Sequence, residues 1–313
     1  MDALTEPLRS RLLQTFSGQP SGTPAWVSDL EHGDDEGFFA PGSAVWTVHR
    51  STSTVVAGVR ALLVQALHPG ALAGVHDHSR FRDDPLGRLA GTIRWIDTVS
   101  FGSREAAAQA SGWVTHVHTG VVGTYVDQHG ATHDYAANDP DLLSWVHLAF
   151  TESFLAAFLR FDRTVIPGGP DAYVRVWATA GELLGVPRPP RSVSEMREQL
   201  AEVDRSGVLE RSARTDEVVG FIRRPPLFRS LRLGYPLLLD GAISTLRPAH
   251  RELLGLRAPH VGPVALPTDG LTRGALAVIR GVRGERPDGA LPALARRERL
   301  RRGGAAAPGR MAG

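Results

Sequence analysis

The feature that most constrains the fold is a pair of helical segments that are apolar at nearly every turn. Residues 54–67 and 141–160 both carry apolar side chains around most of the helix circumference. A helix with this pattern is stable only when other elements cover it on several sides. The apolar positions are Val55, Val56, Val59, Leu62, Leu63, Ala66 and Leu67 in the first segment, and Leu142, Leu143, Val146, Ala149, Phe150, Phe154 and Phe158 in the second. We therefore expect a mostly helical domain built around these two segments.

Local signals predict where many of the helices begin and end. Asp84-Pro85 and Asp139-Pro140 each place an N-cap residue before a proline at the first helical position. Ser51-Thr52-Ser53 can cap the helix that starts near Thr54, and Pro69-Gly70 breaks or kinks it. Further helices are expected over 104–122, 171–185, 192–204, 216–223, 227–246 and 271–282, with a small hairpin over 125–135.

No linker divides the body of the chain, so we predict one all-α domain. The expected boundaries are an N-terminal arm over 1–36, the helical domain over 37–282, and a disordered tail rich in Arg, Gly and Ala over 283–313. From Gly281 onward, eight arginines face three acidic residues, which leaves a surplus of five in a chain of net charge +2. The body is then slightly acidic, and we expect no nucleic-acid partner.

Two residue types are missing from the chain, and their absence excludes several chemistries. There is no cysteine, and all of the Lys+Arg total is arginine. Without cysteine there are no disulfides, thiolate nucleophiles, iron–sulfur clusters or cysteine-ligated haem. Without lysine there is no Schiff base, pyridoxal phosphate attachment or P-loop lysine. Any metal or haem ligand must be His, Asp, Glu or Tyr.

No membrane span or export signal is expected. The first residues, Met1 to Pro7, lack a basic stretch followed by an apolar stretch. The most apolar window, 55–75, contains Arg60, Gln65 and His68, which indicates a buried helix. We predict a cytoplasmic protein without a membrane partner, and dimerisation through exposed apolar helix faces is left open.

The histidines are clustered along the chain. Nine of the 12 lie between His49 and His147. Bunching of this kind suggests a site, but each residue has a structural alternative. His116 and His118 are two positions apart on a helix and point roughly 200° apart, so at most one faces the core. His118 shares a face with apolar neighbours and is the inward candidate, although a hydrogen-bonded core role is more common. His147 and His68 are weighed in the same way.

Arg88 and Thr92 are four residues apart on the helix that begins at Pro85, so they share a face near its apolar stripe. A buried guanidinium needs an anion or several acceptors. One interpretation is that Arg88 faces a bound carboxylate or oxygen species, with Thr92 beside it. The alternative is an internal ion pair with Asp84 or Asp97.

A series of motifs resembles the MpaB-type oxygenase family, which includes the latex-clearing rubber oxygenases. The resemblance covers about residues 37–257 and depends on the order of the motifs. They are Gly42-Ser43-Ala44-Val45-Trp46, Leu62-Leu63-Val64-Gln65-Ala66-Leu67-His68-Pro69, Phe81-Arg82-Asp83-Asp84-Pro85-Leu86-Gly87-Arg88-Leu89, Thr92, Phe101-Gly102 and Trp145-Val146-His147.

This resemblance implies an all-α fold with a globin-like core that binds haem b. It also implies that Arg88 and Thr92 line the haem pocket, that His118 is the proximal iron ligand, and that His147 supports the pocket. Gly91 stands where the rubber oxygenases have a lysine that can take the distal iron position. The distal side would then be open, or covered by His68. No match for the proposed rubber-cleaving glutamate is found, which weighs against polyisoprene as the substrate.

The sequence thus predicts a haem b-dependent oxygenase or peroxygenase. It would use dioxygen or peroxide on a small apolar or aromatic substrate held among Phe150, Phe154 and the 61–67 helix. Arg88 and Thr92 would stabilise negative charge on the bound oxygen species. The rival interpretation is a haem-binding carrier or gas sensor without turnover. A third is a helical protein without haem, whose histidines are all structural.

Overall fold

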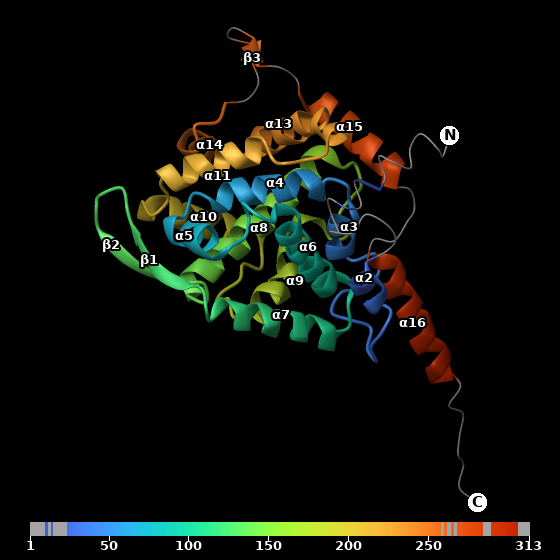
Figure 1. Ribbon diagram of the computed structural model, residues 1–313. Helices are drawn as coiled ribbons and strands as arrows, with labels where there is room; N and C mark the ends of the chain where they lie inside the picture. Colours follow the sequence, from blue (N-terminus) through green and yellow to red (C-terminus); the bar gives the residue numbers. More distant parts are fainter. Residues whose placement is uncertain are drawn as a thin grey trace, which may run out of the picture.

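The second apolar segment forms α8 (Pro140–Phe161), the central helix of the fold (Figure 1). The computed structural model describes residues 10, 11, 14, 24–257, 260–261, 264–265, 268–283 and 289–305. The first apolar segment forms α4 (Thr54–Gln65), which packs along α8. Both helices carry fully buried side chains, including Leu63 and Trp145. The prediction of a mostly helical domain built around these two segments is confirmed.

The remaining helices cover this pair from several sides. α3 and α9 pack against each other, α9 and α10 also contact α8, and α13 contacts both α4 and α15. In chain order these elements, with those not described elsewhere, are α2 (Ala25–Asp29), α3 (Ala44–Arg50), α9 (Gly169–Leu183), α10 (Val193–Ser206), α11 (Ala213–Arg223), α12 (Arg229–Arg232), α13 (Tyr235–Thr245), α14 (Pro248–Leu253), β3 (His260–Val261), β4 (Val264–Ala265) and α15 (Thr268–Arg283).

Proline and a capping carboxylate set the start of two helices as predicted. Asp84 accepts a hydrogen bond from the Gly87 amide at the start of α6 (Pro85–Phe101). Asp139 accepts one from the Asp141 amide at the start of α8. The prediction for α4 is only half right, because the helix starts at Thr54 but no side chain caps it. Its expected cap region is buried without capping the helix, and the Ser51 hydroxyl donates to Asp162.

The break at Pro69 turns the chain sharply. α5 (Pro69–His78) starts at this proline and makes an angle of 106° with α4. It packs on the predicted hairpin, which is formed by β1 (Val122–Val126) and β2 (Thr132–Ala136) in antiparallel register. α6 and α7 (Arg104–His118) pack against each other before this hairpin. The segment expected over 227–246 as one helix is divided into α12 and α13.

The C-terminal segment differs from expectation. We predicted disorder from residue 283, but 290–305 forms α16 (Ala290–Ala305), which packs on α2 (Figure 1). Arg296 and Arg297 are buried there. Arg296 donates to the Phe101 carbonyl oxygen at 2.7 Å, and Arg297 to the Phe39 carbonyl oxygen at 2.9 Å. An arginine-rich composition is typical of a solvated tail. These guanidinium groups instead donate to backbone carbonyl oxygens of residues far away in the sequence.

By length and composition, α8 could cross a membrane, as could α4 and α5 if they formed one bent span. However, 61% of the apolar window of α8 is buried inside the protein. Such burial is what a central core helix requires, so these helices are weak evidence for a membrane span.

Candidate functional site

A cavity of about 870 Å³ lies beside α4 and is enclosed mainly by apolar side chains. Ligand sites in proteins usually occupy about 300–1,000 Å³, so this cavity is near the upper end. Its apolar lining includes Val55, Val59, Leu62, Val75, Phe81, Leu89, Ile93, Ile96, Phe150, Phe154, Phe221, Ile222, Leu237, Leu238 and Ile279. It therefore brings together α4, α6, α8, α11, α13 and α15.

Arg88 and Thr92 both line this cavity, on the face of α6 that the spacing predicted. The Thr92 hydroxyl donates to the Arg88 carbonyl oxygen at 3.3 Å. Since its proton is used within the helix, this hydroxyl presents mainly its lone pairs to the cavity. Phe150 and Phe154 stack with ring centroids 5.3 Å apart and line the same cavity.

The guanidinium of Arg88 has no partner among the described residues. Asp84, one of the two carboxylates considered for an internal ion pair, instead caps α6 through the Gly87 amide. Burial lowers the pKa of Arg88, although an arginine remains protonated in proteins. The Arg88 cation thus lies in a mostly apolar lining, to which Arg50 and Asp97 also contribute charged side chains.

The histidine that lines the cavity is His49, a residue that the sequence did not single out. Its Nδ1 lies 2.7 Å from the Ser100 hydroxyl, and its Nε2 lies 3.1 Å from the Tyr173 hydroxyl. Burial lowers the pKa of His49 to about 3, so the ring is neutral at pH 7. Both ring nitrogens are engaged, which gives His49 the geometry of a satisfied core residue.

His118, the predicted iron ligand, is not part of the cavity lining. It lies in the last turn of α7 and is half-buried, whereas His116 is exposed, as the helical spacing suggested. Its Nδ1 is buried without a hydrogen-bond partner. Burial lowers the pKa of His118, and the nearby Asn138 side chain raises it in part. The structure therefore leaves one nitrogen of His118 free, but does not bring it to Arg88.

His68 and His147 also lie outside the cavity lining. His68 packs near Trp145, with its Nδ1 buried and without a partner. Nε2 of His147 lies 3.5 Å from the hydroxyl of Thr151 on the same helix. Burial lowers the pKa of each of these histidines to about 4. The four predicted site residues at positions 68, 118, 147 and 88 thus do not share one pocket.

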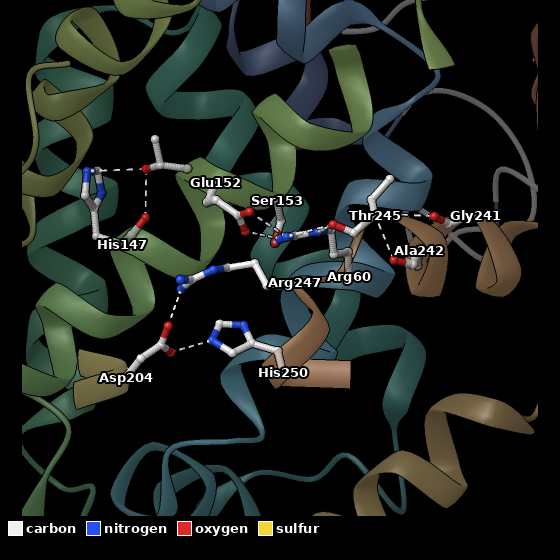
Figure 2. A network of polar contacts seen from close by, with 11 residues as sticks. Arg60, His147, Glu152, Ser153, Asp204, Gly241, Ala242, Thr245, Arg247 and His250 are labelled. Carbon is white, nitrogen blue, oxygen red and sulfur yellow. Dashed lines mark hydrogen bonds and ion pairs between the residues drawn. The ribbon is translucent and has the colours of Figure 1, made fainter. Parts of the chain in front are cut away.

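A separate polar network crosses the core next to α8 (Figure 2). Arg60 reaches from α4 and donates to Ser153 at 2.7 Å and to Glu152 at 2.6 Å. Further along, Asp204 forms an ion pair with Arg247 at 2.7 Å, and its other oxygen lies 2.9 Å from Nε2 of His250. Within the described ranges, no group of three or more His, Asp or Glu side chains is placed to hold a metal ion.

Gln65 is a cavity residue that the sequence reasoning passed over. It closes α4 and lines the cavity, and its Nε2 is buried without a hydrogen-bond partner. An amide in an otherwise apolar helix was the available signal. It was not conclusive, because the sequence does not show which helix faces look into a shared space.

The chain matches one known protein family over most of its length. The family described as ER-bound oxygenase mpaB/B'/Rubber oxygenase, catalytic domain, matches residues 46–280. No curated protein and no solved structure matched the chain, so the globin-like arrangement stays a prediction. The family match covers α4, α6 and α8 and every residue of the cavity lining. With well over half of its length matched, the chain belongs to the mpaB/rubber oxygenase catalytic-domain family.

Proposed function

We propose that the protein oxygenates an apolar small molecule held in the cavity beside α4. Membership of an oxygenase family gives the reaction class. The observation that carries the substrate class is the cavity of about 870 Å³, whose lining is apolar apart from a few side chains such as Arg88. An apolar molecule gains free energy by leaving water for such a space, at roughly 25 cal/mol per Å² of buried surface.

Arg88 is the group that would stabilise negative charge in this cavity. A fixed cation in a site of low dielectric interacts with an anion more strongly than the same cation in water. Thr92, whose hydroxyl proton is bound to the Arg88 carbonyl oxygen, would position rather than donate. Phe150 and Phe154 supply a flat apolar wall against which an aromatic or unsaturated group can pack.

Haem b is the cofactor predicted from the family resemblance, and the residues at the Arg88 cavity do not fit it. Haem needs an axial nitrogen, but His49 has both ring nitrogens engaged. His118, His68 and His147 lie outside the lining. No catalytic step is therefore assigned to haem in this cavity. His118 and His68 each have a buried ring nitrogen without a hydrogen-bond partner, so either would be the candidate axial ligand for haem bound outside this cavity.

The cofactor is tested by hemin titration of the purified protein, followed by absorption. We expect a saturable Soret band at one haem per chain that is lost in His118→Ala. His116→Ala is the matched control, because this residue is exposed on the same helix two positions away. If the His118→Ala protein keeps its band, the proposed ligand is wrong, and His68→Ala is then the informative variant. Absence of a band in every protein rejects haem.

Oxygenation itself is tested with isotopically labelled dioxygen or peroxide and a panel of apolar and aromatic substrates. Incorporation of label into a product, lost in Arg88→Met, is the expected result. A hemin-loaded protein that incorporates no label into any substrate would favour the carrier or gas-sensor alternative and contradict the proposed function.

A further inference from the structure

Two groups that lack hydrogen-bond partners line the same cavity. The guanidinium of Arg88 makes no hydrogen bond or ion pair within the part of the chain that the structure describes. Nε2 of Gln65 is buried and equally without a partner. Leaving a buried polar group without a hydrogen-bond partner destabilises the fold, and more so for a charged group. A ligand with acceptor oxygens would satisfy both.

Arg88 and Gln65 reach the cavity from two different helices, α6 and α4. His49, just before α4, lies 2.7 Å from the hydroxyl of Ser100, near the end of α6. The C-terminal end of α6 therefore lies beside the N-terminal end of α4. Arg88 is in the first turns of α6, and Gln65 closes α4 at its C-terminal end. Asp97 is nine residues beyond Arg88 on the same helix, so about 13 Å along the helix axis separates this carboxylate from the position of Arg88.

The cavity is elongated and opens between exposed apolar side chains. It follows α4 from Thr54 to Gln65, a distance of about 16 Å along the helix axis. Leu233, Leu271 and Val278 line it and are 88%, 58% and 60% exposed. Exposed apolar residues at the rim of an apolar cavity suit the entry of a molecule with a long hydrocarbon part.

We propose that Arg88 and Gln65 bind the carboxylate of an elongated apolar acid of the fatty-acid class, whose chain lies along α4. One cation with a neighbouring amide matches a single carboxylate, which accepts several hydrogen bonds and carries one charge. A phosphate would bring about two charges to this single guanidinium. The inference rests on the proposed function only for the statement that this acid is the oxygenated substrate.

The test compares dodecanoate with dodecanol in a calorimetric binding titration, so that turnover is not needed. We expect the wild-type protein to bind dodecanoate at least tenfold more tightly than dodecanol. Arg88→Met should lose at least tenfold in dodecanoate affinity and keep its dodecanol affinity. Gln65→Leu should lose a few-fold for dodecanoate. Arg94→Met is the matched control, because Arg94 is an exposed arginine of α6 outside the lining, and it should bind both ligands as the wild type does.

The thermal stability of the ligand-free variant supplies an independent measurement. Arg88→Met removes a half-buried charge that has no partner among the described residues, so its midpoint should be equal to or above that of the wild type. A clearly lower midpoint would mean that the guanidinium already has a partner, and would overturn the proposal. Equal dodecanoate affinity in the wild type and in Arg88→Met would overturn it as well.

The propionates of haem are a second possible source of the carboxylate that Arg88 binds. Titration with hemin distinguishes these propionates from the carboxylate of a substrate. If Arg88→Met weakens the binding of hemin but not that of hemin dimethyl ester, and leaves dodecanoate unaffected, the anion is a propionate and the proposal is wrong. If dodecanoate binds through Arg88 but no labelled oxygen enters any product, the proposed function fails while this binding site stands.

Discussion

The most direct test of the core is the removal of Arg60, which bridges α4, α8 and α13 (Figure 2). This guanidinium is fully buried, and it donates to Ser153 and Glu152 and to the Thr245 carbonyl oxygen at 3.2 Å. Arg60→Met keeps much of the volume but leaves a carboxylate and a carbonyl without their donor. Removing one partner of a buried ion pair costs about 3–5 kcal/mol. At roughly 2 °C for each kcal/mol in a chain of this size, the thermal midpoint should fall by about 6–10 °C.

The assays are thermal unfolding for the midpoint and urea unfolding for the free energy of unfolding, both followed by circular dichroism, with one common urea dependence (m-value) for all variants. Arg188→Met is the control, since Arg188 and Glu202 are 80% and 65% exposed and 3.9 Å apart, and it should change the unfolding free energy by less than about 0.5 kcal/mol. Arg60→Met/Glu152→Met should recover part of the loss, because no charge is then stranded. A loss below about 1 kcal/mol in Arg60→Met, or no recovery in the double variant, would refute the reasoning.

Four further predictions concern stability and the attachment of α16. Burial holds the pKa of His147 at about 4 in the folded state, below its ordinary 6.5, so its contribution is complete above pH 6.5 and is lost as the pH falls toward 4. His147→Gln should flatten the dependence of the unfolding free energy in that window by up to about 1.4 kcal/mol per pH unit, and an unchanged slope would contradict this. Gly181→Ala should destabilise by about 1–3 kcal/mol in urea unfolding, because the new Cβ would lie 3.0 Å from His147 Cε1. Gly112→Ala, in open space on α7, should instead stabilise by about 0.5–1 kcal/mol. Arg296→Met should speed limited proteolysis near the N-terminal arm, whereas the exposed Arg302→Met should not; equal rates would mean that α16 does not secure the arm.

Much of the helical framework was predictable because its signals are local. Asp84 and Asp139, each followed by proline, mark the starts of α6 and α8 whatever lies around them. The shared face of Arg88 and Thr92 follows from helical spacing alone. The Ser51 region shows the limit of such signals. Its hydroxyls were expected to cap α4, but Asp162, distant in the sequence, binds Ser51 instead.

The candidate site was only partly predictable. Phe150, Phe154, Arg88 and Thr92 do line one cavity, because each lies on a predictable face of a predictable helix. His118 does not join them, since α7 packs against a side of α6 other than the one that faces the cavity. His49 and Gln65 take its place in the lining; His49 belongs to no motif, and the motif that contains Gln65 does not show which side chains face the cavity.

By itself, the sequence determined that this chain forms apolar helices around a core, that thiolate and lysine chemistry are absent, and that it belongs with oxygenases. These properties depend on residue type and on spacing within a few turns. Tertiary structure alone decided which histidines keep a free nitrogen, which arginine remains unpaired in the cavity, and that the arginines of α16 are buried. Each of those outcomes depends on partners far apart along the chain, such as Arg296 and the Leu30 carbonyl oxygen, whose meeting is set by how the helices pack.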